Sequence, residues 1–185
     1  MIKKHSKSGL CFLLILNFIF VNSASFAQRD QFESGLASKD RGHYATALRA
    51  WIPMAESGNA EAQNNVGYMY EEGLGVPQNY FLAMNWYRQA ADNELAQAQH
   101  NMGMLYHHGY GVAQNLGEAF RWFKMAADQE LAESEYMLGL AYEKGEGTAL
   151  NYGEARRLFL SSARKNYTPA QMMYAFMLQA GEGGD

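Results

Sequence analysis

The chain has a single cysteine, no basic cluster beyond its first residues and no apolar run of membrane-spanning length, and each absence excludes a class of protein. The cysteine is Cys11, so no disulfide can form within the 185 residues and packing alone must hold the fold together. Without a basic cluster, and with a formal net charge of −4, there is no electrostatic footprint for nucleic acid or an anionic membrane surface. The apolar run 10–21 is shorter than the roughly 20 residues of a spanning helix.

Residues 1–27 have the composition of a secretory signal peptide. Three lysines precede the apolar run, and Ser25 and Ala27 supply the small residues of a cleavage site. We expect cleavage after Ala27, which predicts a periplasmic or secreted protein with no membrane insertion once the leader is removed. Cleavage also removes Cys11 and leaves 12 basic against 19 acidic residues, a net charge of −7.

A unit of 36 residues recurs through the remainder of the chain. It spans 60–95, 96–131 and 132–167, and a partial copy covers 168–185. A constant period of this size indicates a stack of supersecondary units. Residues 28–59 have a shorter turn than the full units, and we interpret them as a divergent helix pair that caps the amino-terminal end.

Each full unit is predicted to contain two helices, A and B. Small and apolar residues recur in helix A at steps of three and four, which places them on one stripe. A glycine at the same place in each stripe (67, 103 and 139) indicates a neighbour too close for a Cβ. Helix A is expected to end at Gly73, helix B to begin near Tyr80 after the N-cap Asn79, and the next two units to repeat this. The fold class is therefore all-α, an α-α solenoid.

Large aromatic residues recur in helix B, where we expect them to fill the space between helices. Trp86 and its equivalent Trp122 are the largest of these. If either indole were fully buried, truncation to alanine would cost about 3–5 kcal/mol.

The unit resembles the Sel1-like repeat, a relative of the tetratricopeptide repeat. The resemblance lies in Ala-x-Ala-Gln-x-x-x-Gly-x-x-Tyr-x-x-Gly-x-Gly-Val over 60–76, closely repeated over 96–112, and in the helix B motif Ala83-x-x-Trp86-Tyr87-x-x-Ala90-Ala91. It implies a right-handed superhelix of antiparallel helix pairs that acts as a protein-binding adaptor and not as an enzyme. Relatives of this kind with a signal peptide are similar in being exported, and some are linked to signalling, envelope regulation or host-cell contact.

Opposite the recurring stripe, helix A carries positions that differ between the copies. Their spacing of i, i+4 and i+7 forms one line on each helix, and stacking sets the lines side by side as an inner surface. Aromatic residues and methionines among polar neighbours are typical of recognition surfaces, so we predict that a peptide or protein partner binds here. The alternative is that adjacent helices cover some of these side chains. The candidates are Asn64, Tyr68, Glu71, His100, Met104, His107, Tyr136, Leu140, Glu143, Met172, Phe176 and Gln179.

A second functional class is suggested by Ser162 and Lys165, which fit the Ser-x-x-Lys nucleophile motif of penicillin-recognising enzymes. A few cysteine-rich relatives of the repeat family have been described as penicillin-binding or β-lactamase-like. The companion motifs Ser-Asp-Asn and Lys-Thr-Gly do not follow, and Ser162 occupies the position of Ala90 and Ala126 in the packed stripe. A β-lactam-recognising enzyme is thus the alternative to the non-catalytic reading.

His100, Met104, His107 and His108 raise the question of a metal site, because imidazole and thioether groups are metal ligands. Other residue types occupy these positions in the preceding unit, and no cysteine or carboxylate completes a ligand set on the same helix. We therefore expect neither a metal nor a cofactor.

The partial unit 168–185 supplies a helix A and ends where its helix B would begin. We expect this to leave Met173, Met177 and Leu178 short of a covering partner. The helix either caps the array with an apolar surface, pairs with another chain, or belongs to a fragment of a longer product. Self-association through 168–185 is accordingly a third functional alternative.

Overall fold

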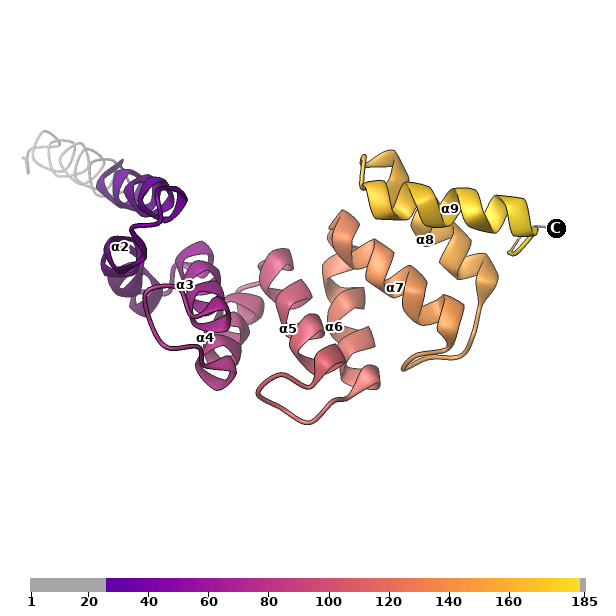
Figure 1. The fold of residues 1–185 in the computed structure, drawn as a ribbon, viewed down its shortest axis with the longest axis horizontal. Coiled ribbons are helices and arrows are strands. Elements are labelled where there is room, and N and C mark those ends of the chain that lie inside the picture. Colours follow the sequence, from indigo (N-terminus) through magenta and orange to yellow (C-terminus); the bar gives the residue numbers. More distant parts are fainter. Residues whose placement is uncertain (1–25, 184–185) are drawn as a thin grey trace, which may run out of the picture.

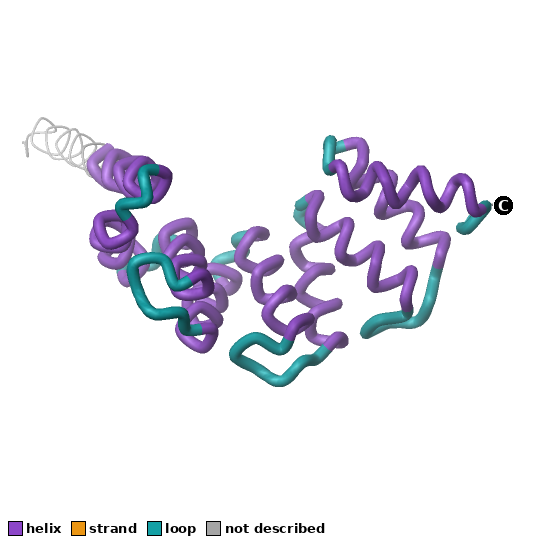
Figure 2. Tube along the Cα trace, viewed as in Figure 1, coloured by secondary structure: helices purple, strands orange, loops and turns teal. Residues whose placement is uncertain are grey.

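The computed structural model describes residues 26–183, which form helices joined by turns and loops and contain no strand (Figures 1 and 2). The predicted signal peptide lies outside the described residues except for Phe26 and Ala27, which belong to the helical segment 26–40. After that segment come α2 (Tyr44–Glu56), α3 (Ala60–Glu72), α4 (Tyr80–Asp92), α5 (Ala96–His108), α6 (Leu116–Asp128), α7 (Ala132–Lys144), α8 (Tyr152–Arg164) and α9 (Thr168–Ala180). The predicted all-α solenoid is confirmed.

Consecutive helices from α2 to α9 pack against one another, and the chain forms a curved row (Figure 1). The A helices are α3, α5, α7 and α9, and the B helices are α4, α6 and α8. Figure 2 shows the three long loops that join A to B along the outer edge of the arc. The shorter turns, which join each helix B to the next helix A, lie toward its inner side.

Local signals set the helix ends at the residues predicted. The Asn79 side chain accepts a hydrogen bond from the Leu82 amide at 3.0 Å, and Asn115 and Asn151 cap α6 and α8 in the same way. At the carboxyl end of α3, Gly73 adopts a left-handed conformation with φ 68° that residues with a side chain rarely adopt. The same cap ends α5 and α7.

The predicted close approach at the helix A glycines is confirmed, and the approaching group is an aromatic ring. A Cβ on Gly67 would lie 2.7 Å from the ring of Tyr87, and one on Gly103 would lie 2.5 Å from that of Phe123. Tyr87, Phe123 and their equivalent Phe159 are fully buried. The ring and the missing side chain are thus complementary parts of one helix contact.

The tryptophans play a smaller part than their size suggests. Trp86 and Trp122 are only half-buried, so the condition for a loss of 3–5 kcal/mol on truncation is not met. The residue that follows each of them, Tyr87 or Phe123, occupies the core instead. Trp51 is the exception: it is fully buried on α2, and its indole N–H donates a hydrogen bond to the Phe32 carbonyl at 3.2 Å.

Within the described part of the chain, no helix has the length and apolar character needed to cross a membrane.

Candidate partner-binding surface

The twelve predicted residues lie on α3, α5, α7 and α9, three on each helix, and every one of them keeps some exposure to solvent. We refer to this set as the A face. Met172 and Phe176 are the most exposed of its apolar members, with 70% and 57% of their surface accessible, and Tyr68 follows with 40%. The remaining apolar members are half-buried, with one side against the core and the other open.

On α3, the A face is held in position by polar contacts. The Asn64 side chain accepts a hydrogen bond from the Asn101 amide at 2.9 Å, which joins α3 to α5. The Lys39 ammonium lies 5.7 Å from the centre of the Tyr68 ring, within cation–π range. The Tyr87 hydroxyl donates a hydrogen bond to the Glu71 carboxylate. Burial raises the pKa of Glu71, and this bond partly opposes the rise.

On α5, the A face contains two histidines that contact the next unit. His100 Nδ1 lies 2.8 Å from Ser134 Oγ on α7, and burial lowers the pKa of His100. His107 Nε2 lies 3.6 Å from a carboxylate oxygen of Glu146.

Among residues 26–183 no group of three or more His, Cys, Asp or Glu side chains could hold a metal ion.

On α7, aromatic packing fixes the A face. The Tyr136 ring lies 5.7 Å from the ring of Phe159 and 5.4 Å from that of Tyr167. Leu140 packs against the same core cluster and, with His107, lines a small hollow of about 70 Å³ between neighbouring units. Burial raises the pKa of Glu143, although the charge of Lys144 opposes the rise.

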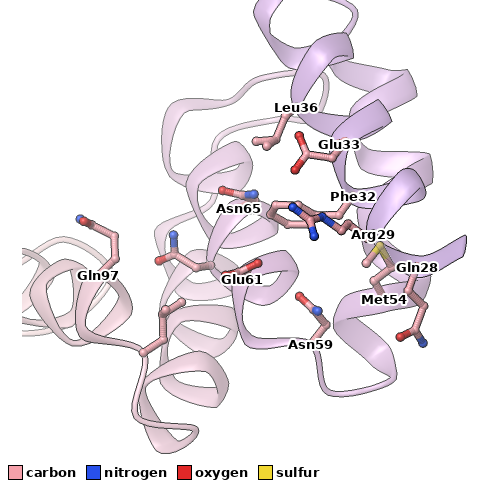
Figure 3. Close-up of a pocket in the computed structure, with 12 residues that line it drawn as sticks. Gln28, Arg29, Phe32, Glu33, Leu36, Met54, Asn59, Glu61, Asn65 and Gln97 are labelled. Carbon is pink, nitrogen blue, oxygen red and sulfur yellow. The ribbon is translucent and has the colours of Figure 1, made fainter. Parts of the chain in front are cut away.

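A large hollow lies at the amino-terminal end of the described chain, between the segment 26–40 and helices α2, α3 and α5 (Figure 3). We call it the N-terminal cleft; its volume is about 680 Å³. Apolar side chains, several amides and three charged groups line it together. They are Gln28, Arg29, Phe32, Glu33, Leu36, Met54, Asn59, Glu61, Asn64, Asn65, Leu95 and Gln97.

Only Asn64 of the predicted set lines the N-terminal cleft. The other cleft residues were missed because one wall is the segment 26–40, which has no repeat copy with which to compare it. For the second wall, formed by α3 and α5, the sequence did contain a signal that could have identified its residues. Glu61 and Gln97 occupy equivalent places three residues before Asn64 and His100, so they continue the predicted line by one helical turn.

The Ser-x-x-Lys motif is occupied by structural contacts. Ser162 is fully buried, and its hydroxyl donates a hydrogen bond to the Ala132 carbonyl at 2.7 Å. The Lys165 ammonium lies 2.9 Å from Glu135 Oε1 and donates to the Glu130 carbonyl at 2.7 Å. The Ser162 hydroxyl therefore forms a buried contact between two helices and does not face a substrate site.

The expectation for the last helix requires a correction. Met177 is fully buried against Phe159 and Ala155, and Met173 packs partly against the same cluster, so α8 covers both. Leu178 is 48% exposed, as predicted.

Comparison with known proteins places these features in a family. A model of the Sel1 repeat matches residues 60–95, 96–131 and 132–167. A search of curated proteins found no match. Among solved structures 23 chains match, and one is a Sel1 repeat protein from Oxalobacter formigenes, with a TM-score of 0.77 and 32% identity over 83% of this chain.

A second similar structure is a protective antigen present in uropathogenic Escherichia coli strains that displays an SLR fold. It has a TM-score of 0.80 and 30% identity over 91% of this chain. The present chain spans 63% of the length of the Oxalobacter protein and 37% of that of the Escherichia coli protein. Both likenesses extend beyond the three matched repeats, since they cover more of the chain than residues 60–167.

Proposed function

The chain belongs to the Sel1 repeat family, and on this premise we propose that it is a non-catalytic adaptor that binds a peptide or protein partner in the groove lined by its A helices. Repeats of this family generally serve as protein-interaction modules, and the family is typically non-catalytic. Because repeat scaffolds reuse one fold for many ligands, the site must be argued from this chain's own residues.

The observation that carries the proposal is the row of aromatic and methionine side chains on the A face. Tyr68, Phe176 and Met172 are exposed, and Tyr136 and Met104 are half-buried. Each lies on a helix that packs against its neighbours, so little further conformational entropy is lost when a partner binds. Rigid aromatic side chains provide large contact areas at low entropic cost, which is why they are enriched at interfaces.

We further propose that the adaptor acts in the periplasm or as a secreted protein, after cleavage at Ala27. The basic, apolar and small residues of 1–27 support this proposal. Sequencing the amino terminus of the protein recovered from its native host tests it. A first residue other than Gln28 or a close neighbour would contradict the proposed site.

The groove is tested by truncating two of its aromatic residues. We expect Tyr136→Ala with Phe176→Ala to weaken binding to a partner captured from an envelope extract by at least about tenfold, since truncating a hot-spot residue costs about 2 kcal/mol or more. Phe81→Ala is the matched control, because Phe81 is 63% exposed on the B helix α4. If the double variant binds with unchanged affinity and circular dichroism shows intact helicity, the groove is excluded as the binding site.

Self-association through α9 is a second candidate function, favoured by one observation. Leu178 is 48% exposed and Tyr174 half-buried, whereas Val66, the equivalent of Tyr174, is fully buried in a cluster against which Trp86 of its helix B packs. Light scattering tests it. We expect Leu178→Gln to abolish any dimer while Met125→Gln, which alters a similarly exposed side chain on α6, leaves it intact. A monomeric parent protein removes this candidate.

A further inference from the structure

Charge is distributed unevenly between the two kinds of helix. The A helices α3, α5, α7 and α9 together contain six glutamates and one lysine, a net charge of −5. Helices α2, α4, α6 and α8 together contain seven basic and five acidic residues, a net charge of +2. Among these helices, the ones that carry the A face therefore have the net negative charge.

On the B helices α4, α6 and α8, three of the four acidic residues pair with a basic residue of the same helix. Arg121 pairs with Glu118 at 2.9 Å, Lys124 with Asp128 at 2.8 Å, and Arg157 forms the same kind of bond with Glu154. Such pairs at i, i+3 and i, i+4 cancel one another's field at a short distance. An approaching partner therefore meets little uncompensated negative charge on these helices, where Asp92 is the one acid outside the ion pairs found within residues 26–183.

The A helices compensate few of their acids. Glu135 pairs with Lys165. The ion pairs found within residues 26–183 include none of the five other A-helix glutamates, which are Glu61, Glu71, Glu72, Glu133 and Glu143. These five carboxylates therefore place uncompensated negative charge on the A helices.

The effect of this charge appears on neighbouring groups. Burial lowers the pKa of His100, and the charge of Glu133 opposes that fall. Burial raises the pKa of Tyr68, and the charges of Glu72 and Glu71 add to the rise. The charges of these glutamates therefore influence the pKa of side chains that belong to the A face.

Basic groups on the same side are few and are spread along it. Lys39 lies over the Tyr68 ring, Lys144 ends α7, and Arg29 lines the N-terminal cleft between Glu33 and Glu61 (Figure 3). In the cleft the two carboxylates come from the segment 26–40 and from α3, and the side chain of Phe32 lies near both (Figure 3). Acidic and apolar side chains therefore occur together in this cleft, as they do on the A face of α3 and α7.

We propose that the partner of the A face is a polypeptide segment in which lysine or arginine side chains alternate with large apolar ones. This inference rests on the proposed function and names the chemistry of the partner. The cationic ends pair with Glu61 and Glu133, while aliphatic stems and apolar side chains pack against Phe32, Tyr136 and Phe176. Lysine and arginine suit such a surface because their stems are apolar and their ends are charged.

The required length of the segment follows from the stacking of the units. Glu61 and Glu133 lie on α3 and α7, two A helices apart, and hydrogen bonds join α3 to α5 and α5 to α7. With about 10 Å between neighbouring helices, the two carboxylates are roughly 20 Å apart. An extended chain covers that distance with about six residues.

Three synthetic peptides of equal length test the charge requirement, with Lys-Ser-Leu, Gln-Ser-Leu or Glu-Ser-Leu as the repeated unit. Fluorescence anisotropy with the full-length purified protein should show the lysine peptide binding about tenfold more tightly than the glutamine peptide, and the glutamate peptide weakest. The advantage of the lysine peptide should shrink as salt is raised, because added ions screen exposed charges. Equal affinity for the lysine and glutamine peptides would overturn the inference.

Paired variants locate the charge effect. We expect Glu61→Gln with Glu133→Gln to weaken binding of the lysine peptide about fivefold to tenfold, and to leave the glutamine peptide unchanged. The matched control is Glu118→Gln with Glu154→Gln, which removes the same charge from the B helices. An equal loss in the control would show a net-charge effect only and would contradict the assignment to the A face.

The two proposals fail in different ways. If the glutamine peptide binds as tightly as the lysine peptide and Tyr136→Ala weakens both, the groove stands and its preference for cationic segments is wrong. If none of the three peptides binds, the cationic-segment inference is overturned, while capture of a folded partner through Tyr136 and Phe176 still decides the proposed function.

Discussion

A glycine stands at the same position of α3, α5 and α7, and in each case an aromatic ring of the paired helix occupies the space that a Cβ would fill. The ring belongs to the residue after the tryptophan position. This contact is the most repeated feature of the core, so its tolerance to a single added carbon measures how tightly each unit is packed.

Gly103→Ala should destabilise the protein by about 1–3 kcal/mol, because the new Cβ would lie 2.5 Å from the Phe123 ring. The gain in helix propensity, up to about 1 kcal/mol, offsets only part of this cost. Gly117→Ala is the matched control, since its Cβ would meet only the Asn115 side chain, at 3.4 Å. Urea unfolding measures the free energy of unfolding of both variants, and equal stability of the two would contradict the packing argument.

His100 links stability to pH. Burial lowers the pKa of His100 in the folded state, so its neutral form is favoured there and its contribution is present above the unfolded pKa. That contribution is lost as the pH falls through the folded pKa. We expect His100→Asn, which installs the side chain found at Asn64, to lose less stability than the parent between pH 7 and pH 5. Parallel pH profiles of the two proteins in thermal unfolding would refute this.

Neighbouring units are joined by a polar contact that recurs with different residues. Gln63 donates a side-chain hydrogen bond to the Ala55 carbonyl at 3.0 Å, and Gln99 and Gln171 bond to the equivalent carbonyls. The third unit has Glu135 at this position, which cannot donate such a bond when ionised. Lys165 compensates, because its ammonium pairs with Glu135 where Gln129 bonds to Gln99 one unit earlier.

Removing one partner of this pair should cost more than removing both. Lys165→Met leaves the buried Glu135 carboxylate with only the Ser161 hydroxyl as a described partner, and we expect a loss of about 1–3 kcal/mol. The full penalty for a buried pair is not expected because the Lys165 side chain is 30% exposed. Glu135→Gln with Lys165→Gln reproduces the second unit and should recover most of the loss. Additive effects in a double-mutant cycle would show that the pair is not coupled.

Because each unit contacts only its neighbours, the same side chain should matter differently at the middle and at the end of the array. Met69 on α3 and Met177 on α9 hold equivalent positions, and both are fully buried. We expect Met69→Ala to cost about 2–5 kcal/mol and to raise amide exchange throughout the chain. Met177→Ala should raise exchange chiefly in α8 and α9, as fraying of the last unit. Uniform exchange in both variants would indicate a single cooperative unit instead.

The bounds of the helices and the all-α solenoid followed from sequence because their determinants are local and repeated. An asparagine before each B helix and a glycine after each A helix act on the adjoining backbone, and three copies make the pattern unambiguous. The line of variable positions was likewise predicted from helical spacing together with the differences between the copies.

Tertiary packing decided what local patterns could not. Whether Trp86 or Tyr87 enters the core depends on how the paired helices cross, and adjacent residues of one helix point about 100° apart. The N-terminal cleft depends on a helix without a repeat copy, and the burial of Met177 depends on how α8 meets α9. Sequence determined which elements form and which faces they present, since those are properties of short segments. The contacts between segments determined which side chains those faces bury and where they leave a hollow.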